Sequence, residues 1–178
     1  MNKPQVATNV DVSVLREAFE PNLFGLVQTT TTLLPLVRKA QQGPGVILNV
    51  STDMASNATQ AKPNSRSHWV AYNTSKAAAN SYAIALAHEL RVEGSTIRVN
   101  CVTPGFTSTK LNNFGTGGKT PKQGAEILFP WALLDARGPT GDFQMRRMTL
   151  HLLLTGVLTL LKVCSSGKMA MKRRGESV

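Results

Sequence analysis

Residues 72–91 read YNTSKAAANSYAIALAHELR, and this stretch decides the fold. Its Ala and Leu content is typical of a helix, and Gly94 follows where helices commonly end. One helical turn separates Tyr72 from Lys76, so both side chains lie on the same face of the predicted helix. Because a neighbouring ammonium favours the phenolate, this spacing predicts a Tyr72 pKa below the ordinary value of about 10. Such a tyrosine can exchange a proton with an alcohol or carbonyl near neutral pH, although the same spacing also arises by chance.

Two short apolar runs flank this helix. Residues 46–50 (VILNV) predict a β-strand that is buried on both faces, and residues 96–102 (TIRVNCV) predict a second strand. Between the first strand and the helix, residues 51–71 are polar and predict a long loop.

Further helices are predicted at both ends of this core. Residues 12–40 carry a broad apolar stripe, with a bend or boundary at Pro21 and Gly25. Residues 121–134 predict another helix that begins near Pro121. The order helix–strand–helix–strand–helix predicts an α/β fold with a parallel sheet and right-handed crossovers.

The net charge of +10 suggests an acidic partner such as nucleic acid. Seven of the 20 Lys and Arg residues, however, lie in residues 144–178 against a single acidic residue, so the body of the chain is only mildly basic. We therefore expect no nucleic-acid partner. Cys101 and Cys164 lie far apart, which favours a reducing compartment. No apolar leader follows Met1, and we expect a cytoplasmic protein.

Several motifs occur in an order that resembles the short-chain dehydrogenase/reductase family, from about residue 11 to about residue 143. Several motifs in the right order are far more specific than any one of them. They are the N-x-x-G segment Asn22–Gly25, the strand end at Ser51-Thr52, the Y-x-x-S-K segment Tyr72–Lys76 and the turn Pro104-Gly105.

The resemblance implies an NAD(P)-dependent oxidoreductase that interconverts a small-molecule carbonyl and a secondary alcohol. In this family the tyrosine exchanges the proton, which implies that role for Tyr72. Lys76 would lower the Tyr72 pKa and hold the nicotinamide ribose. The substrate-orienting serine is generally the second of two, a position that Thr52 occupies here, with Ser51 as the fallback. Two further roles are implied: Asn22 would position a relay water, and Pro104, Gly105 and Thr107 would approach the cofactor. The family leans slightly to NADP over NAD, and no metal site is expected.

The sequence also departs from the family's pattern. No T-G-x-x-x-G-x-G turn occurs in residues 1–45, so the resemblance implies a partial Rossmann-like fold, a doubly wound parallel sheet without its first strands. We expect a two-stranded remnant whose first strand has an open edge. We place this truncated domain at residues 1–143.

Residues 144–178 form a basic, Leu-rich segment that we predict to be a non-homologous tail, helical or disordered. Its apolar stretch, Leu150–Leu161, is shorter than the roughly 20 residues that a membrane span needs. An interfacial helix is the alternative, but the charge of the tail supports it only weakly, and we expect no membrane contact.

Two functional hypotheses therefore stand side by side. The first is the oxidoreductase described above. The second is an inactive, truncated homologue that acts as a dimerisation or interaction protein, because the family commonly pairs through the helices that correspond to residues 12–40 and 72–91. The expected partner is a second copy of this chain or a full-length relative.

Overall fold

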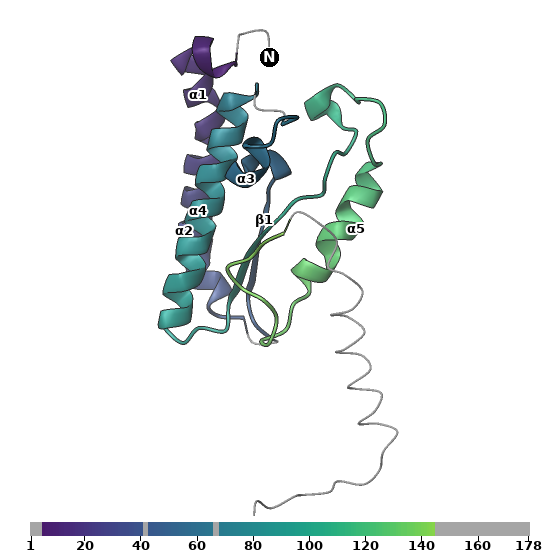
Figure 1. Cartoon of the computed structure of the whole chain (residues 1–178). Helices are drawn as coiled ribbons and strands as arrows, with labels where there is room; N and C mark the ends of the chain where they lie inside the picture. Colours follow the sequence, from purple (N-terminus) through teal and green to yellow (C-terminus); the bar gives the residue numbers. More distant parts are fainter. Residues whose placement is uncertain (1–4, 41–42, 66–67, 145–178) are drawn as a thin grey trace, which may run out of the picture. The chain divides into compact units, whose positions relative to one another are not determined.

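The computed structural model describes residues 5–40, 43–65 and 68–144, which form helices around a parallel sheet (Figure 1). The helices are α1 (Val12–Phe19), α2 (Gly25–Val37), α3 (Asn57–Gln60), α4 (Val70–Val92) and α5 (Pro121–Ala132). The strands are β1 (Val46–Val50), β2 (Arg98–Val102) and β3 (Phe143–Gln144), in the spatial order β1-β2-β3. This architecture confirms the predicted α/β, partial Rossmann-like class. Apart from Gln144, the predicted tail lies outside the described residues, so the domain boundary at residue 143 stays a prediction.

The hydrophobic core lies where α4 packs against β2. Four of the β2 residues are buried, and Val99 and Cys101 join the core from this strand. Helix α4 ends where Gly94 adopts a φ of +72° and Ser95 N donates to the Leu90 carbonyl oxygen at 2.9 Å. The buried members of this core are Ala83, Leu86, Ala87, Leu90, Ile97, Val99 and Cys101.

Helices cover the two faces of the sheet (Figure 1). Helices α1, α2 and α4 gather on one side, and α5 lies on the other. Helix α5 begins at a capping box in which the Thr120 hydroxyl accepts from Gln123 N, with Pro121 in the first turn as predicted. Its Trp131 is buried, so this helix closes the second face.

The predicted bend near Pro21 and Gly25 is confirmed as a π-helical turn, Glu20–Phe24, between α1 and α2. Pro21 has no backbone N–H, so a regular helix cannot continue through it. The helix instead forms a wider turn with one extra residue, in which Gly25 N donates to the Glu20 carbonyl oxygen. A Cβ atom at Gly25 would lie 3.3 Å from that oxygen, so glycine suits the close approach.

Three sequence predictions about the sheet region are wrong. Strand β1 lies at the edge of the described sheet as expected, but it is not buried on both faces: only Asn49 is buried, and Val50 is 50% exposed. The sheet has a third short strand, because the Asn100 side chain binds residues 139 and 142 and draws β3 onto β2. Residues 51–71 are not simply a loop: a 3-10 turn, Asp53–Ala55, and α3 form there, capped by the hydroxyls of Thr52 and Ser56.

None of the helices in residues 5–40, 43–65 and 68–144 combines the length and the apolar character that a membrane crossing requires. The apolar stretch of the tail, Leu150–Leu161, lies outside these residues.

The core packing leads to a stability prediction. Leu90 is 1% exposed, so Leu90→Ala should lower the free energy of unfolding by about 2–5 kcal/mol through lost burial and the cavity that remains. Val92→Ala is the matched control on the same helix, because Val92 is 74% exposed, and it should change stability little. Urea denaturation followed by circular dichroism measures both. Equal losses for the two variants would contradict this account of the core.

Candidate active site at the carboxyl edge of the sheet

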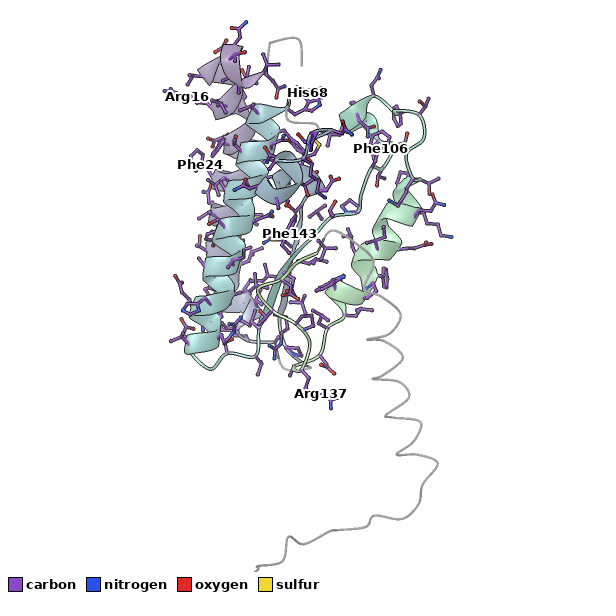
Figure 2. The ribbon with its side chains drawn as sticks, viewed as in Figure 1. Arg16, Phe24, His68, Phe106, Arg137 and Phe143 are labelled. Atoms are coloured by element: carbon purple, nitrogen blue, oxygen red, sulfur yellow. The ribbon has the colours of Figure 1, made fainter. Side chains whose placement is uncertain are left out.

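Strands β1 and β2 end at the same edge of the parallel sheet, and α4 begins beside that edge. Figure 2 shows His68 and Phe106 at this end of the molecule and Arg137 at the opposite end. Because side chains at the carboxyl ends of parallel strands meet at one place, the segments that follow β1 and β2 reach the start of α4. This edge holds the residues that the sequence singled out.

Thr52 and Tyr72 face each other at this edge. Thr52 follows β1 and is only 8% exposed, and its hydroxyl forms a hydrogen bond with the phenol of Tyr72. The same hydroxyl donates to Asp53 Oδ1 at 3.2 Å. A phenol beside a hydroxyl that is partly shielded from water can bind a carbonyl or alcohol oxygen and exchange a proton with it.

Ser51 points elsewhere, although it neighbours Thr52 in the sequence. Its hydroxyl donates to Asn80 Oδ1 at 2.7 Å, and both residues are buried. Consecutive residues of an extended chain point to opposite sides, so only one of the pair can reach Tyr72. Of the two alternatives that the sequence left open, Thr52 is the one beside the phenol, and Ser51 ties the end of β1 to α4.

Lys76 lies one turn after Tyr72 on α4, but its ammonium does not lower the Tyr72 pKa as predicted. Burial raises the pKa of Tyr72, the hydrogen bond with Thr52 lowers it, and the Asp53 carboxylate raises it. Lys76 Nζ donates instead to the Val50 carbonyl oxygen at 3.0 Å. The prediction from spacing is therefore wrong for this arrangement, because spacing on a helix does not fix where a long side chain ends.

Burial also changes the pKa of Lys76. It lowers this pKa, and the nearby Cys101 raises it to a smaller extent. The thiol of Cys101 is buried, and burial raises its pKa to about 11 against the lowering effects of Asn49 and Lys76. Below that pH the thiol is neutral, so Cys101 adds no charge beside Lys76 at neutral pH.

Asn22 reaches the same end of α4 from the π-helical turn. Its Nδ2 donates to Ser75 Oγ at 3.0 Å, and Ser75 Oγ donates to the Tyr72 carbonyl oxygen at 2.9 Å. Ser75 is fully buried. Ser75 thus bridges Asn22 and the backbone of Tyr72. The π-helical turn holds Asn22 in this position.

The turn after β2 brings Pro104, Gly105 and Thr107 to this edge. Gly105 has a φ of +71°, a conformation that side chains disfavour, and its N–H donates to Thr103 Oγ1 at 3.1 Å. Thr107 Oγ1 donates to the Gly105 carbonyl oxygen at 3.1 Å. Lys119 Nζ donates to the Pro104 carbonyl oxygen at 3.3 Å and lies 2.6 Å from where a Gly105 Cβ atom would be.

These residues suit one end of a nicotinamide cofactor. The Gly105 backbone lies at the carboxyl edge beneath Lys119, and the Lys76 ammonium lies at the end of β1, where both could contact a bound nicotinamide end. Among residues 5–40, 43–65 and 68–144, neither β1 nor β2 runs directly into a glycine-rich turn and a helix, the arrangement that cradles a diphosphate. The same residues contain no cluster of three or more potential metal ligands.

Three residues of this edge were missed by sequence reasoning. Asp53 could have been noticed because it directly follows Thr52 in the sequence. Its hydrogen bond with the Thr52 hydroxyl, however, depends on a 3-10 turn that the sequence did not predict. Asn80 lies eight residues after Tyr72 on a helix, a position without a recognisable pattern. Lys119 approaches Gly105 only because the backbone of residues 106–108 pairs with it.

Comparison with known proteins adds to this geometry. The family model for short chain dehydrogenase matches residues 1–116. Salutaridine reductase of Papaver somniferum is 41% identical over 73 residues, which make up 41% of this chain and 22% of that enzyme. Dehydrogenase/reductase SDR family member 9 of Homo sapiens is 34% identical over 96 residues, 54% of this chain and 26% of the relative.

Solved structures resemble the described fold. The structure of salutaridine reductase from Papaver somniferum gives a TM-score of 0.61 at 28% identity, covering 72% of this chain and 54% of that one. A short chain dehydrogenase from Shigella flexneri complexed with NADP gives a TM-score of 0.61 at 25% identity, covering 80% and 58%. The chain thus spans little more than half the length of these solved structures. The segments that match the two curated relatives make up about a quarter of each relative's length.

The placement of Ser51 leads to a second prediction. Ser51→Ala should lower the free energy of unfolding by about 1–3 kcal/mol, because it leaves the buried Asn80 Oδ1 without its donor. Ser81→Ala is the control, because Ser81 is exposed on the same helix beside Asn80. Chemical denaturation of both variants against the parent chain is the measurement. Unchanged stability in Ser51→Ala would show that this hydrogen bond does not fasten β1 to α4.

Proposed function

This chain belongs to the short-chain dehydrogenase family, and from that premise we propose that it interconverts a carbonyl and a secondary alcohol, with Tyr72 exchanging the proton. The observation that supports the proposal most directly is the hydrogen bond between Tyr72 and Thr52 at the carboxyl edge of the sheet. Two hydroxyl groups that converge there can bind one substrate oxygen and move a proton at it.

Each residue of the edge has a part in this chemistry. In the reducing direction Tyr72 gives its phenolic proton to the oxygen of the substrate as the C=O bond becomes C–OH. Thr52 holds the same oxygen in place through its hydroxyl, which can both donate and accept. The ordinary pKa of a tyrosine is near 10 and burial raises that of Tyr72, so the phenol is protonated at neutral pH and has a proton to give.

A nicotinamide cofactor would supply the hydride for reduction, or accept it in oxidation. Lys76, Gly105 and Thr107 would hold its nicotinamide end at this edge. NADP is favoured slightly over NAD, and the similar dehydrogenase complexed with NADP supports this choice. A cytoplasmic location belongs to the same proposal.

Two residues act by positioning. Asn22 is held by Ser75 beside the Tyr72 backbone, where its amide can order a water molecule of a proton relay. Ser51 fixes the end of β1 through Asn80, so it sets the direction in which Thr52 points.

A second candidate function is association with another copy of this chain or with a full-length relative. The observation that favours it is the apolar surface of α2, where Leu33 and Leu36 are 46% and 62% exposed. These side chains are three residues apart and so share one face of the helix. Apolar side chains that are exposed next to each other mark interaction sites more often than single exposed apolar side chains do.

The enzymatic proposal predicts that Tyr72→Phe lowers carbonyl reduction by roughly a hundredfold or more, because the proton donor is removed. Tyr82→Phe is the control on the same helix and should retain activity. NADPH and NADH consumption with a panel of small ketones and aldehydes measures the rates, and cofactor fluorescence measures binding. Absence of binding at millimolar NADPH and NADH would exclude the enzymatic reading for this chain and leave the second candidate.

The association proposal predicts that the double substitution Leu33→Glu and Leu36→Glu converts an oligomer to a monomer, because buried apolar contacts become charged. The control is Leu111→Glu, since Leu111 is 75% exposed in a 3-10 turn away from α2. Sedimentation velocity of the three proteins gives their masses. A parent chain that sediments as a monomer would contradict self-association.

A further inference from the structure

The loop between β2 and α5 closes on itself. Its two ends pair through the backbone: Lys119 N donates to the Phe106 carbonyl oxygen at 3.0 Å, and Ser108 N donates to the Lys119 carbonyl oxygen at 2.9 Å. The Phe106 ring packs against the loop, because a Cβ atom added at Gly115 or Gly118 would lie 3.0 or 3.2 Å from it. The loop therefore has a defined shape, and it lies at the end of the molecule where α5 begins (Figure 1).

One side chain, that of Asn112, fixes the tip of this loop, residues 110–114. Its Oδ1 accepts from Thr109 N at 3.0 Å and from Gly115 N at 3.3 Å, and its Nδ2 donates to the Thr107 carbonyl oxygen at 2.7 Å. Three hydrogen bonds of a single amide thus hold the backbone on both sides of the tip. The remaining side chains of the tip are presented from fixed positions.

Phe114 occupies a position in this tip that neither the backbone nor the core explains. Its φ is +55°, a left-handed conformation that a bulky side chain disfavours and glycine adopts readily. Its side chain is 66% exposed, so it adds little to the packing of the described residues. Leu111, in a 3-10 turn of the same tip, is 75% exposed. Two large apolar side chains on a strained, fixed tip indicate a contact outside the chain.

The charge around this tip has one sign. Residues 106–125 contain no aspartate or glutamate but three exposed lysines, Lys110, Lys119 and Lys122. A surface that combines apolar side chains with positive charge suits a partner that is apolar inside and anionic outside. An anionic lipid bilayer has both properties.

We propose that this loop is a docking surface for an anionic bilayer, in which Leu111 and Phe114 enter the headgroup boundary and the lysines bind the headgroups. Apolar side chains gain free energy when they leave water at that boundary, and each lysine near the surface adds electrostatic attraction. Docking of this kind needs no spanning helix. A protein partner suits the tip less, because a specific protein interface takes about 20–30 residues a side, far more than this tip offers.

This surface goes beyond the proposed function, so it can be tested in the full chain whether or not the chain is active. The parent chain should sediment with vesicles of phosphatidylcholine and phosphatidylserine more than with pure phosphatidylcholine, and added salt should weaken this binding. The tip variant, Leu111→Ser with Phe114→Ser, should lower the partition coefficient about tenfold or more. The charge variant, Lys110→Gln with Lys122→Gln, should lower it about 25-fold, since each lysine near the surface contributes about fivefold.

The chain offers a matched control for the tip variant on α5. Phe129 and Leu133 are 64% and 72% exposed, close to the values of the two tip residues, but they lie between Glu126 and Asp135 instead of among lysines. Acidic neighbours are repelled by an anionic surface. Phe129→Ser with Leu133→Ser should therefore leave vesicle binding unchanged.

A second control separates the position of a lysine from the net charge. The charge of residues 144–178 is the same in every variant, so its attraction to anionic vesicles cancels in the comparison. Lys39 is exposed between α2 and β1, at the opposite edge of the sheet. Lys39→Gln removes one positive charge there and should lower binding clearly less than Lys110→Gln does.

A fluorescence measurement reports on the tip itself. With anionic vesicles the emission of Phe114→Trp should shift to shorter wavelength, whereas Phe129→Trp should shift no more than the parent chain, and circular dichroism verifies that each variant folds. Equal vesicle binding by the parent and by the tip or charge variant would overturn the proposal, as would a parent chain that does not bind. If the parent ignores vesicles but sediments more slowly once the tip is substituted, the tip contacts a second copy of this chain instead.

Discussion

The packing of α4 against β2 is the constraint on which the rest of the described structure depends. Helix α4 spans 23 residues, and its C-terminal half supplies Ala83, Leu86, Ala87 and Leu90 to the core. Its N-terminal end carries Tyr72 and Lys76. Because a helix is stiff over this length, docking the apolar half onto β2 also fixes the direction in which the polar end meets the strand ends. Core and site are therefore two parts of one element, and the position of the site is set by packing far from it.

The edge strand β1 is the weaker side of this arrangement. It pairs only with β2 in the described sheet, and its last residue, Val50, is half exposed. Two hydrogen bonds from α4 compensate for this at the strand end: Lys76 Nζ binds the Val50 carbonyl oxygen, and Asn80 accepts from Ser51. The buried pair is the more stabilising of the two, because water cannot compete for it. The direction of Thr52 thus depends on groups that do not touch Tyr72.

Patterns with a strong physical period were predictable from the sequence, and the directions of individual side chains were not. The bounds of β1 agree with those predicted, and the bend in residues 12–40 was expected because proline cannot continue a regular helix. The open edge of β1 was expected, but the exposure of its residues was mispredicted, because an apolar run does not reveal how fully its neighbours cover a strand. The choice between Ser51 and Thr52 stayed open, since it depends on how the strand end is rotated. The resemblance identified the family, but it carried no information about Asp53.

The raised pKa of Tyr72 bears on which half-reaction the site supports. A proton donor or acceptor works best when its pKa lies near the working pH, so a raised pKa leaves the Tyr72 phenol protonated at neutral pH but makes it a weaker acid. Burial and Asp53 both favour the neutral phenol, and burial also disfavours the charged form of Lys76. The electrostatics of this edge therefore keep Tyr72 in its neutral form, which has a proton to give, and a bound cofactor or substrate would have to lower the pKa of Tyr72 for fast proton transfer.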